Sequence, residues 1–144
     1  MKFVTRWEIF AFGSAFFAGV TAILGKMGVA DINSNLATFI RTVVIVGVGA
    51  LILFCKNEWQ RPDTIGIKTW VFLILSGIAT GLSWLCYYRA LQLGPVSKVA
   101  PIDKLSILFA ILLGIVFLGE KITWPAACGA GLITVGAMVI VVWG

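Results

Sequence analysis

The chain has 144 residues, of which 60% are hydrophobic and only 12% carry a charged side chain. Soluble domains carry about 25% charged residues, so this chain has too little polar surface for a soluble globule, whereas a bilayer covers apolar surface directly. It has no histidine, and its three cysteines lie singly within apolar stretches. These features exclude histidine-based catalysis, zinc sites and a disulfide framework. The composition therefore predicts an all-α integral membrane protein that is not an enzyme.

Five long apolar stretches follow one another along the chain. A hydrocarbon core about 30 Å thick needs about 20 helical residues that rise about 1.5 Å each. Continuous apolar runs of this length are typical of helices, and the chain has neither a single amphipathic stripe nor the alternation of a barrel. We predict a single transmembrane domain over residues 1–144, with five transmembrane helices at about 8–27, 34–55, 68–91, 95–118 and 122–143.

The first apolar stretch resembles a secretory signal peptide in outline, because Lys2 and Arg6 precede it. Glu8, however, lies where a signal peptide is basic, and the apolar run is longer than a signal core. We therefore expect this helix to be retained.

Five spans place the two ends of the chain on opposite sides of the membrane. The N-terminal side would carry Lys2, Arg6, Lys56, Arg61, Lys68 and Lys121, and the other side Lys26, Arg89 and Lys98, with Arg41 and Lys104 deeper. The N-terminal side thus has slightly more basic residues than the other side. This weak bias favours a cytoplasmic N-terminus and leaves insertion in both orientations open. Many transporters use two inverted repeats with the substrate site between them. A five-helix chain reaches that architecture as an antiparallel homodimer or beside a second, related chain.

Two positions in and after the fourth predicted helix are structurally informative. Pro101 lies in the first turns, where it either bends the helix beside Asp103 and frees carbonyls toward a cavity or is an ordinary first-turn proline. Glu120 lies where the fourth helix gives way to the fifth. A carboxylate is disfavoured at the end of a helix and favoured at the start of the next, so we interpret Glu120 as a structural hairpin residue.

Several segments carry a family resemblance over nearly the whole chain. The third and fourth predicted helices contain Ala79-Thr-Gly-Leu-Ser-Trp-Leu-Cys-Tyr-Tyr-Arg-Ala-Leu-Gln-Leu-Gly94, Pro95-Val-Ser-Lys-Val-Ala-Pro101 and Phe117-Leu-Gly-Glu120, and the first hairpin contains Gly25-Lys-Met-Gly28 and Ser34-Asn-Leu-Ala-Thr-Phe-Ile-Arg41. Together these segments resemble the EamA-like family of the drug/metabolite transporter superfamily. Most members carry ten helices as two such units. The resemblance implies a half-length member that transports small metabolites or drugs, often outward.

Three charged residues lie where a bilayer disfavours them. Arg41 is 15 residues before Lys56, about 22 Å along a helix, and is therefore inside a core about 30 Å thick. By the same measure from Glu120, Asp103 and Lys104 lie just inside the opposite boundary. Because a buried ion is costly, we expect these side chains to face a partner or a water-filled cavity.

The functional interpretation of these charges is a binding site for an anionic or zwitterionic solute. Arg41 would hold a carboxylate or phosphate, and Lys104 would add a point charge. Asp103 would bind an amine or hold Lys104 in place. The alternative is that Asp103 only pairs with Lys98 or another neighbour while the long cationic side chains extend to the lipid headgroups.

Aromatic and basic residues of the third predicted helix extend this candidate site. Trp84 and Tyr88 are four residues apart, share a helix face and could line the pocket by stacking or cation–π contact. For Tyr88 the alternative is an interfacial aromatic belt. Arg89 and Lys26 complete the candidate set, with anchoring of their side chains in the headgroups as the alternative.

We predict a secondary transporter of small metabolites, an exporter that works by alternating access between two inverted protomers in the plasma membrane, a bacterial inner membrane. Its expected partners are membrane lipid, the solute and a second half-transporter. We expect no nucleic-acid partner and no cofactor, because there is no presented basic cluster and no Gly-rich phosphate loop. The alternative is a non-transporting scaffold or regulatory subunit. Export of lipophilic cations, as in small multidrug resistance relatives, is less favoured because the acid of the first helix, Glu8, lies at its very start.

Overall fold

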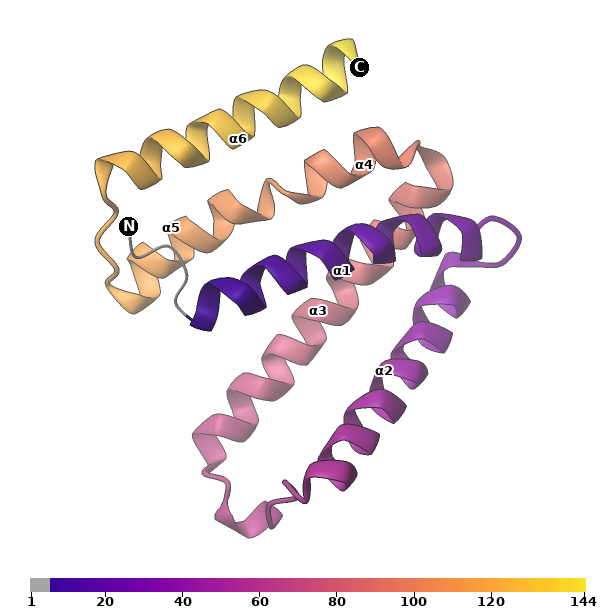
Figure 1. The fold of residues 1–144 in the computed structure, drawn as a ribbon, viewed down its shortest axis with the longest axis vertical. Helices are drawn as coiled ribbons and strands as arrows, with labels where there is room; N and C mark the ends of the chain where they lie inside the picture. Colours follow the sequence, from indigo (N-terminus) through magenta and orange to yellow (C-terminus); the bar gives the residue numbers. More distant parts are fainter. Residues whose placement is uncertain (1–5) are drawn as a thin grey trace. The chain divides into compact units, whose positions relative to one another are not determined.

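In a computed structural model, which describes residues 6–144, the chain is built from α-helices and one short 3-10 turn (Figure 1). The elements are α1 (Arg6–Gly28), α2 (Ser34–Lys56), η1 (Pro62–Thr64), α3 (Ile67–Leu93), α4 (Val96–Asp103), α5 (Ser106–Leu118) and α6 (Trp124–Trp143). No strand occurs among residues 6–144, so the all-α prediction is confirmed. Lys2 and the side chain of Arg6 lie outside the described part.

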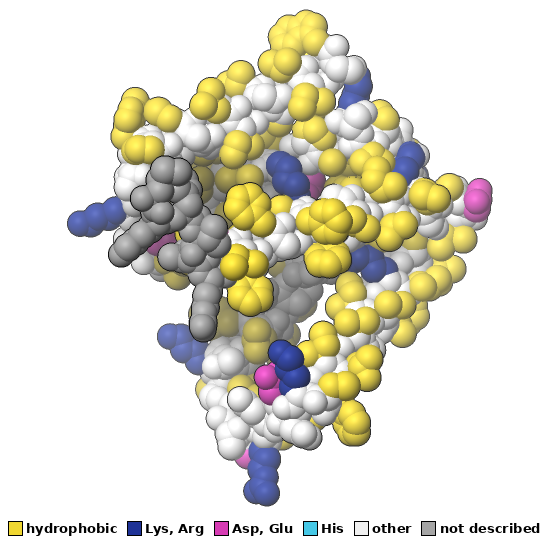
Figure 2. All heavy atoms as spheres, in the orientation of Figure 1, with side chains coloured by type: hydrophobic (Ala, Val, Ile, Leu, Met, Phe, Trp, Pro, Cys, Tyr) yellow, Lys and Arg dark blue, Asp and Glu magenta, His cyan; other side chains and the backbone are white. Residues whose placement is uncertain are grey.

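Five helical segments are long and apolar enough to cross a membrane. They are Trp7–Gly28, Ser34–Lys56, Ile67–Leu93, Val96–Leu118 and Trp124–Trp143, of which the fourth combines α4 and α5. No more than 11% of any span's apolar window is buried within the chain. Figure 2 shows hydrophobic side chains spread along the helices of the face that it draws. Apolar surface on this scale needs lipid or another chain to cover it, so the protein is a multi-pass membrane protein.

The helices group into two compact units, and we describe each by itself. The first contains α1 up to Leu24 together with Leu93–Gly144. Within it, α6 packs against α4 and α5 (Figure 1). Ala130 and Ala137 are the buried residues of α6, and they are seven positions apart on one face of the helix. Their small side chains let the helix backbones approach closely, as is common in membrane bundles.

The second unit, Gly25–Gln92, contains the end of α1, all of α2 and nearly all of α3. The side chain of Asn33 caps the start of α2 by accepting a hydrogen bond from the N–H of Asn35 at 2.8 Å. Asn57 ends the helix in the left-handed conformation. From there the chain turns through η1, and α3 returns antiparallel to α2 (Figure 1).

The fourth span is interrupted after its first turns. Pro101 has no backbone N–H to donate and disturbs the helix on its N-terminal side. α4 ends at Asp103 and α5 begins at Ser106. Between them the N–H of Lys104 is shared between the carbonyls of Ala100 at 3.3 Å and Pro101 at 3.2 Å, and the N–H of Leu105 bonds three residues back to the carbonyl of Ile102 at 3.0 Å. The break follows Pro101, whereas a proline disturbs the turn before it, so both interpretations of Pro101 stay open.

The connection from α5 to α6 depends on a glycine. Gly119 has φ +66°, a left-handed conformation that a residue with a side chain adopts only at a cost. The N–H of Glu120 then bonds back to the carbonyl of Gly114 at 3.2 Å. The carboxylate of Glu120 lies over Gly114, because a Cβ on that glycine would be 2.9 Å from Oε2. These contacts support the interpretation of Glu120 as a hairpin residue.

Candidate functional site

Arg41 of α2 lies against the ring of Trp84 of α3. Its guanidinium carbon Cζ is 3.3 Å from the centroid of the Trp84 ring, and both side chains are half-buried. A guanidinium at this distance is attracted by the negative face of the indole. No hydrogen bond or ion pair joins the Arg41 guanidinium to another side chain within residues 6–144. The ring therefore holds the cation while its N–H donors stay available.

Tyr88 lies beside the Trp84 ring and links it to a third helix. Tyr88 is one helical turn away, with ring centroids 5.7 Å apart and planes tilted by 43°. Its side chain is only 5% exposed. The Tyr88 ring lies against Gly25 at the end of α1, where a Cβ would be 3.2 Å from a ring carbon. Arg41, Trp84, Tyr88 and Gly25 thus bring three helices together, and we call them the Arg41 cluster.

A hydrogen-bonded arrangement at the end of α3 lies next to this cluster. The side-chain amide Nε2 of Gln92 donates to the carbonyls of Val29 at 3.0 Å and Ile32 at 2.7 Å, both in the α1–α2 turn. Its Oε1 accepts a hydrogen bond from Nη1 of Arg89 at 3.0 Å. We call Gln92 with its three partners the Gln92 clasp. The clasp ties the end of α3 to the turn between α1 and α2.

Lys26 makes a second connection between α1 and α3. Its amine donates a hydrogen bond to the carbonyl of Leu91. The side chain of Leu91 and that of Val29 in the turn are both fully buried. A lysine near the end of a helix commonly satisfies carbonyls that have no helical partner. The structure therefore places Lys26 and Arg89 at contacts within the chain, and their contact with a solute stays a prediction.

Asp103 and Lys104 belong to the other unit, at the interruption between α4 and α5. The Lys104 amine is 3.3 Å from Oδ2 of Asp103, and the two side chains are 53% and 38% exposed, respectively. The contact fits both interpretations of Asp103, as a residue that holds Lys104 in a solute site and as the partner of a neighbouring cation. Within the second unit the structure brings together Arg41, Trp84 and Tyr88.

Gln92 and Gly25 were not predicted from the sequence to belong to the site. Gln92 is four residues after Tyr88 and therefore on the same face of α3, which was an available signal. Its acceptors, however, are backbone carbonyls, and no side-chain pattern marks them. Gly25 stands out only once the structure shows a ring against it.

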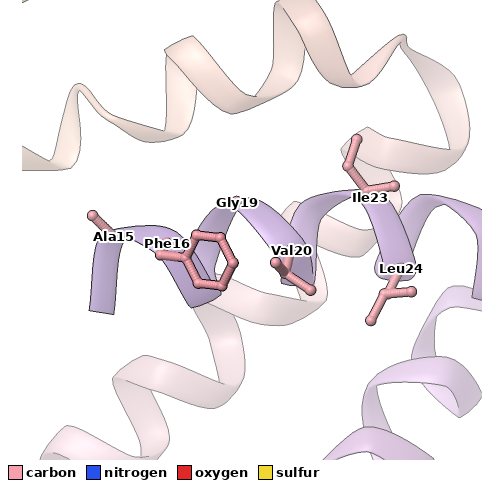
Figure 3. Close-up of a pocket in the computed structure, with 6 residues that line it drawn as sticks. All are labelled: Ala15, Phe16, Gly19, Val20, Ile23 and Leu24. Atoms are coloured by element: carbon pink, nitrogen blue, oxygen red, sulfur yellow. The ribbon is translucent and has the colours of Figure 1, made fainter. Parts of the chain in front are cut away.

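An open hollow in the second half of α1 offers no comparable chemistry. Figure 3 shows Ala15, Phe16, Gly19, Val20, Ile23 and Leu24, which line an open hollow along this one helix. All six are apolar or glycine, whereas a solute site needs a few polar groups to orient its ligand. Metal binding gains no support either, because no group of three metal-ligating side chains occurs within residues 6–144. The Arg41 cluster is therefore the best candidate site.

Comparison with known proteins gives a family and a relative. The EamA-like transporter family matches residues 5–142. A protein from Sinorhizobium sp., named "Uncharacterized transporter in cobO 3'region", is 50% identical over 137 residues, which cover 95% of this chain and 97% of the relative. No solved structure matches the chain significantly. The resemblance deduced from the sequence motifs is confirmed, and the chain belongs to the EamA-like transporter family.

Proposed function

We propose that the chain is one half of a secondary transporter that exports small anionic or zwitterionic metabolites. The family and the name of the Sinorhizobium relative support transport as the activity. The Arg41 cluster supports the charge class of the solute. The proposed location is the plasma membrane, a bacterial inner membrane, which agrees with the source of the relative.

The observation that carries the charge class is the guanidinium of Arg41 on the face of Trp84. Stacking leaves the edge of the guanidinium plane accessible, and that edge can donate two parallel hydrogen bonds to a carboxylate or phosphate. A charged arginine inside the hydrocarbon core is costly, by up to about 3 kcal/mol at the bilayer centre. An anionic solute that pairs with Arg41 offsets this cost. Solute binding would therefore account for a charged residue at this position in the membrane.

The proposed assembly is an antiparallel pair of chains. Five spans place the two chain ends on opposite sides, so a second copy in the opposite orientation supplies an inverted repeat. The relative covers the same five-span length, because the aligned residues make up 97% of it. Rocking of the two protomers about a central solute would then give alternating access, driven by a gradient of ions or of the solute itself.

Solute counterflow in proteoliposomes tests the activity and the charge class together. We expect saturable exchange of labelled carboxylates, phosphorylated metabolites or amino acids, and none of neutral polyols or quaternary amines. Empty liposomes provide the background. Exchange of quaternary amines alone would contradict the charge class. If none of these solute classes is exchanged and a different chain co-purifies, the result would favour a scaffold or regulatory subunit.

A further inference from the structure

One face of α3 carries contacts to α1, to α2 and to the α1–α2 turn. Trp84, Tyr88 and Gln92 are spaced four residues apart, and side chains at this spacing lie above one another on a helix. From the middle of the span outward, Trp84 contacts Arg41, Tyr88 contacts Gly25, and Gln92 bonds to the turn. The rotation of α3 about its axis therefore sets all three contacts at once.

The Gln92 amide has only one orientation that satisfies its neighbours. Two backbone carbonyls can accept only from the NH₂ group, and Arg89 can donate only to the oxygen. Both amide hydrogens and one lone pair of the oxygen are used. The bonds to Val29 and Ile32 approach from two positions of the turn, so they fix the end of α3 in rotation as well as in distance.

We infer that Gln92 is a positioning residue for the Arg41 cluster, because the clasp fixes the rotation of α3 that places Trp84 against the Arg41 guanidinium. Apolar packing alone fixes this rotation poorly, since most side chains of α3 are exposed and do not pack against the other described helices. The relevance of this placement to solute binding rests on the proposed function, whereas the placement of Trp84 by the Gln92 clasp does not depend on it.

Replacement of Gln92 by glutamate removes the two N–H donors of the side-chain amide and keeps its shape. Glu has the same shape as Gln, yet its carboxylate cannot donate to the carbonyls of Val29 and Ile32 and repels them electrostatically. It can still accept from Arg89. A matched control is Gln60→Glu, since Gln60 is an exposed residue of the loop before η1 and makes no contact with the cluster.

The test is ¹⁹F NMR of the full chain labelled with 5-fluorotryptophan. The sequence has six tryptophans, and the resonance of Trp84 is assigned as the one that Trp84→Phe removes. Arg41→Met gives the chemical shift of an indole without the guanidinium. We expect Gln92→Glu to move the Trp84 resonance at least halfway to that position and to leave the resonances of Trp59 and Trp143 unchanged. Gln60→Glu should leave the Trp84 resonance in place.

A second variant keeps the inference testable if Gln92→Glu does not fold. Arg89 is exposed, so Arg89→Met is expected to fold, and it removes the donor that orients the Gln92 amide. We expect a smaller displacement of the Trp84 resonance in the same direction. An unchanged Trp84 resonance in folded Gln92→Glu, or in Arg89→Met where the first variant is unfolded, overturns the positioning role. A wild-type protein without counterflow would contradict the proposed function and leave this spectroscopic result intact.

Discussion

Arg41→Ala is expected to lower the counterflow of an anionic solute by about 100-fold or more, with no loss of folded protein. A charge-assisted hydrogen bond contributes about 1.5–3 kcal/mol, and a guanidinium can make two to one carboxylate. A loss of about 3 kcal/mol corresponds to a factor of about 100 in affinity. Folding should survive, because removal of a charge without an ionic partner in the described part relieves the membrane-spanning segment of a costly group.

Two variants make the Arg41 measurement specific. Arg41→Lys keeps the charge but loses the planar fork and the stacked geometry, so we expect it to restore only a minor part of the counterflow. Arg61→Ala removes one arginine from the exposed loop at η1 and should behave as wild type. Wild-type counterflow in Arg41→Ala would remove this residue from the site. An equal loss in Arg61→Ala would assign the effect to net charge.

Gly25→Leu is expected to lower the thermal midpoint of the purified protein by about 5 °C and to abolish counterflow. A Cβ at this position already lies 3.2 Å from a ring carbon of Tyr88, whose side chain is 5% exposed and has little room to move. Overpacking of this kind costs about 1–3 kcal/mol, partly offset by the better helix propensity of leucine. For a chain of this size, 1 kcal/mol shifts the midpoint by about 3–4 °C. A displaced Tyr88 would also push on Trp84, with which its ring is in contact.

Gly28 provides the matched control on the same helix. It is exposed, and nothing lies within 4 Å of the position that its Cβ would take. Gly28→Leu should therefore leave the midpoint unchanged or raise it slightly. Size-exclusion chromatography after a series of heating steps measures both variants. Equal decreases in the two would show that the effect comes from leucine in α1 and not from the contact with Tyr88.

The spans could be predicted from sequence because the bilayer itself dictates their length. Charged or turn-forming residues bound each apolar stretch, so five helices followed without knowledge of their packing. The interruption of the fourth span was less determined. Pro101 indicated an irregularity in this part of the span. The residues at which α4 ends and α5 begins, however, are defined by backbone hydrogen bonds that the sequence pattern does not reveal. The prediction of a single domain over residues 1–144 stays a prediction.

The site was predictable only where side chains meet side chains. The depth of Arg41 in its span and the four-residue spacing of Trp84 and Tyr88 pointed to residues that the structure places together. For Lys26 and Arg89, a solute contact and a headgroup contact were the two alternatives. The structure gives each another partner, a backbone carbonyl and a glutamine amide. Such partners are set by how helices approach in space, which local sequence patterns do not determine.

The proposed antiparallel homodimer requires that this chain inserts into the membrane in both orientations. Labelling of single cysteines on intact cells with a membrane-impermeant maleimide measures this topology. The background lacks Cys55, Cys86 and Cys128, and one cysteine replaces either Asp63 in the exposed loop at η1 or the C-terminal Gly144. These positions lie on opposite sides of any one chain with five spans. An antiparallel homodimer predicts partial labelling of both positions, with full labelling after permeabilisation. Labelling of only one position would show a fixed orientation and contradict the antiparallel homodimer.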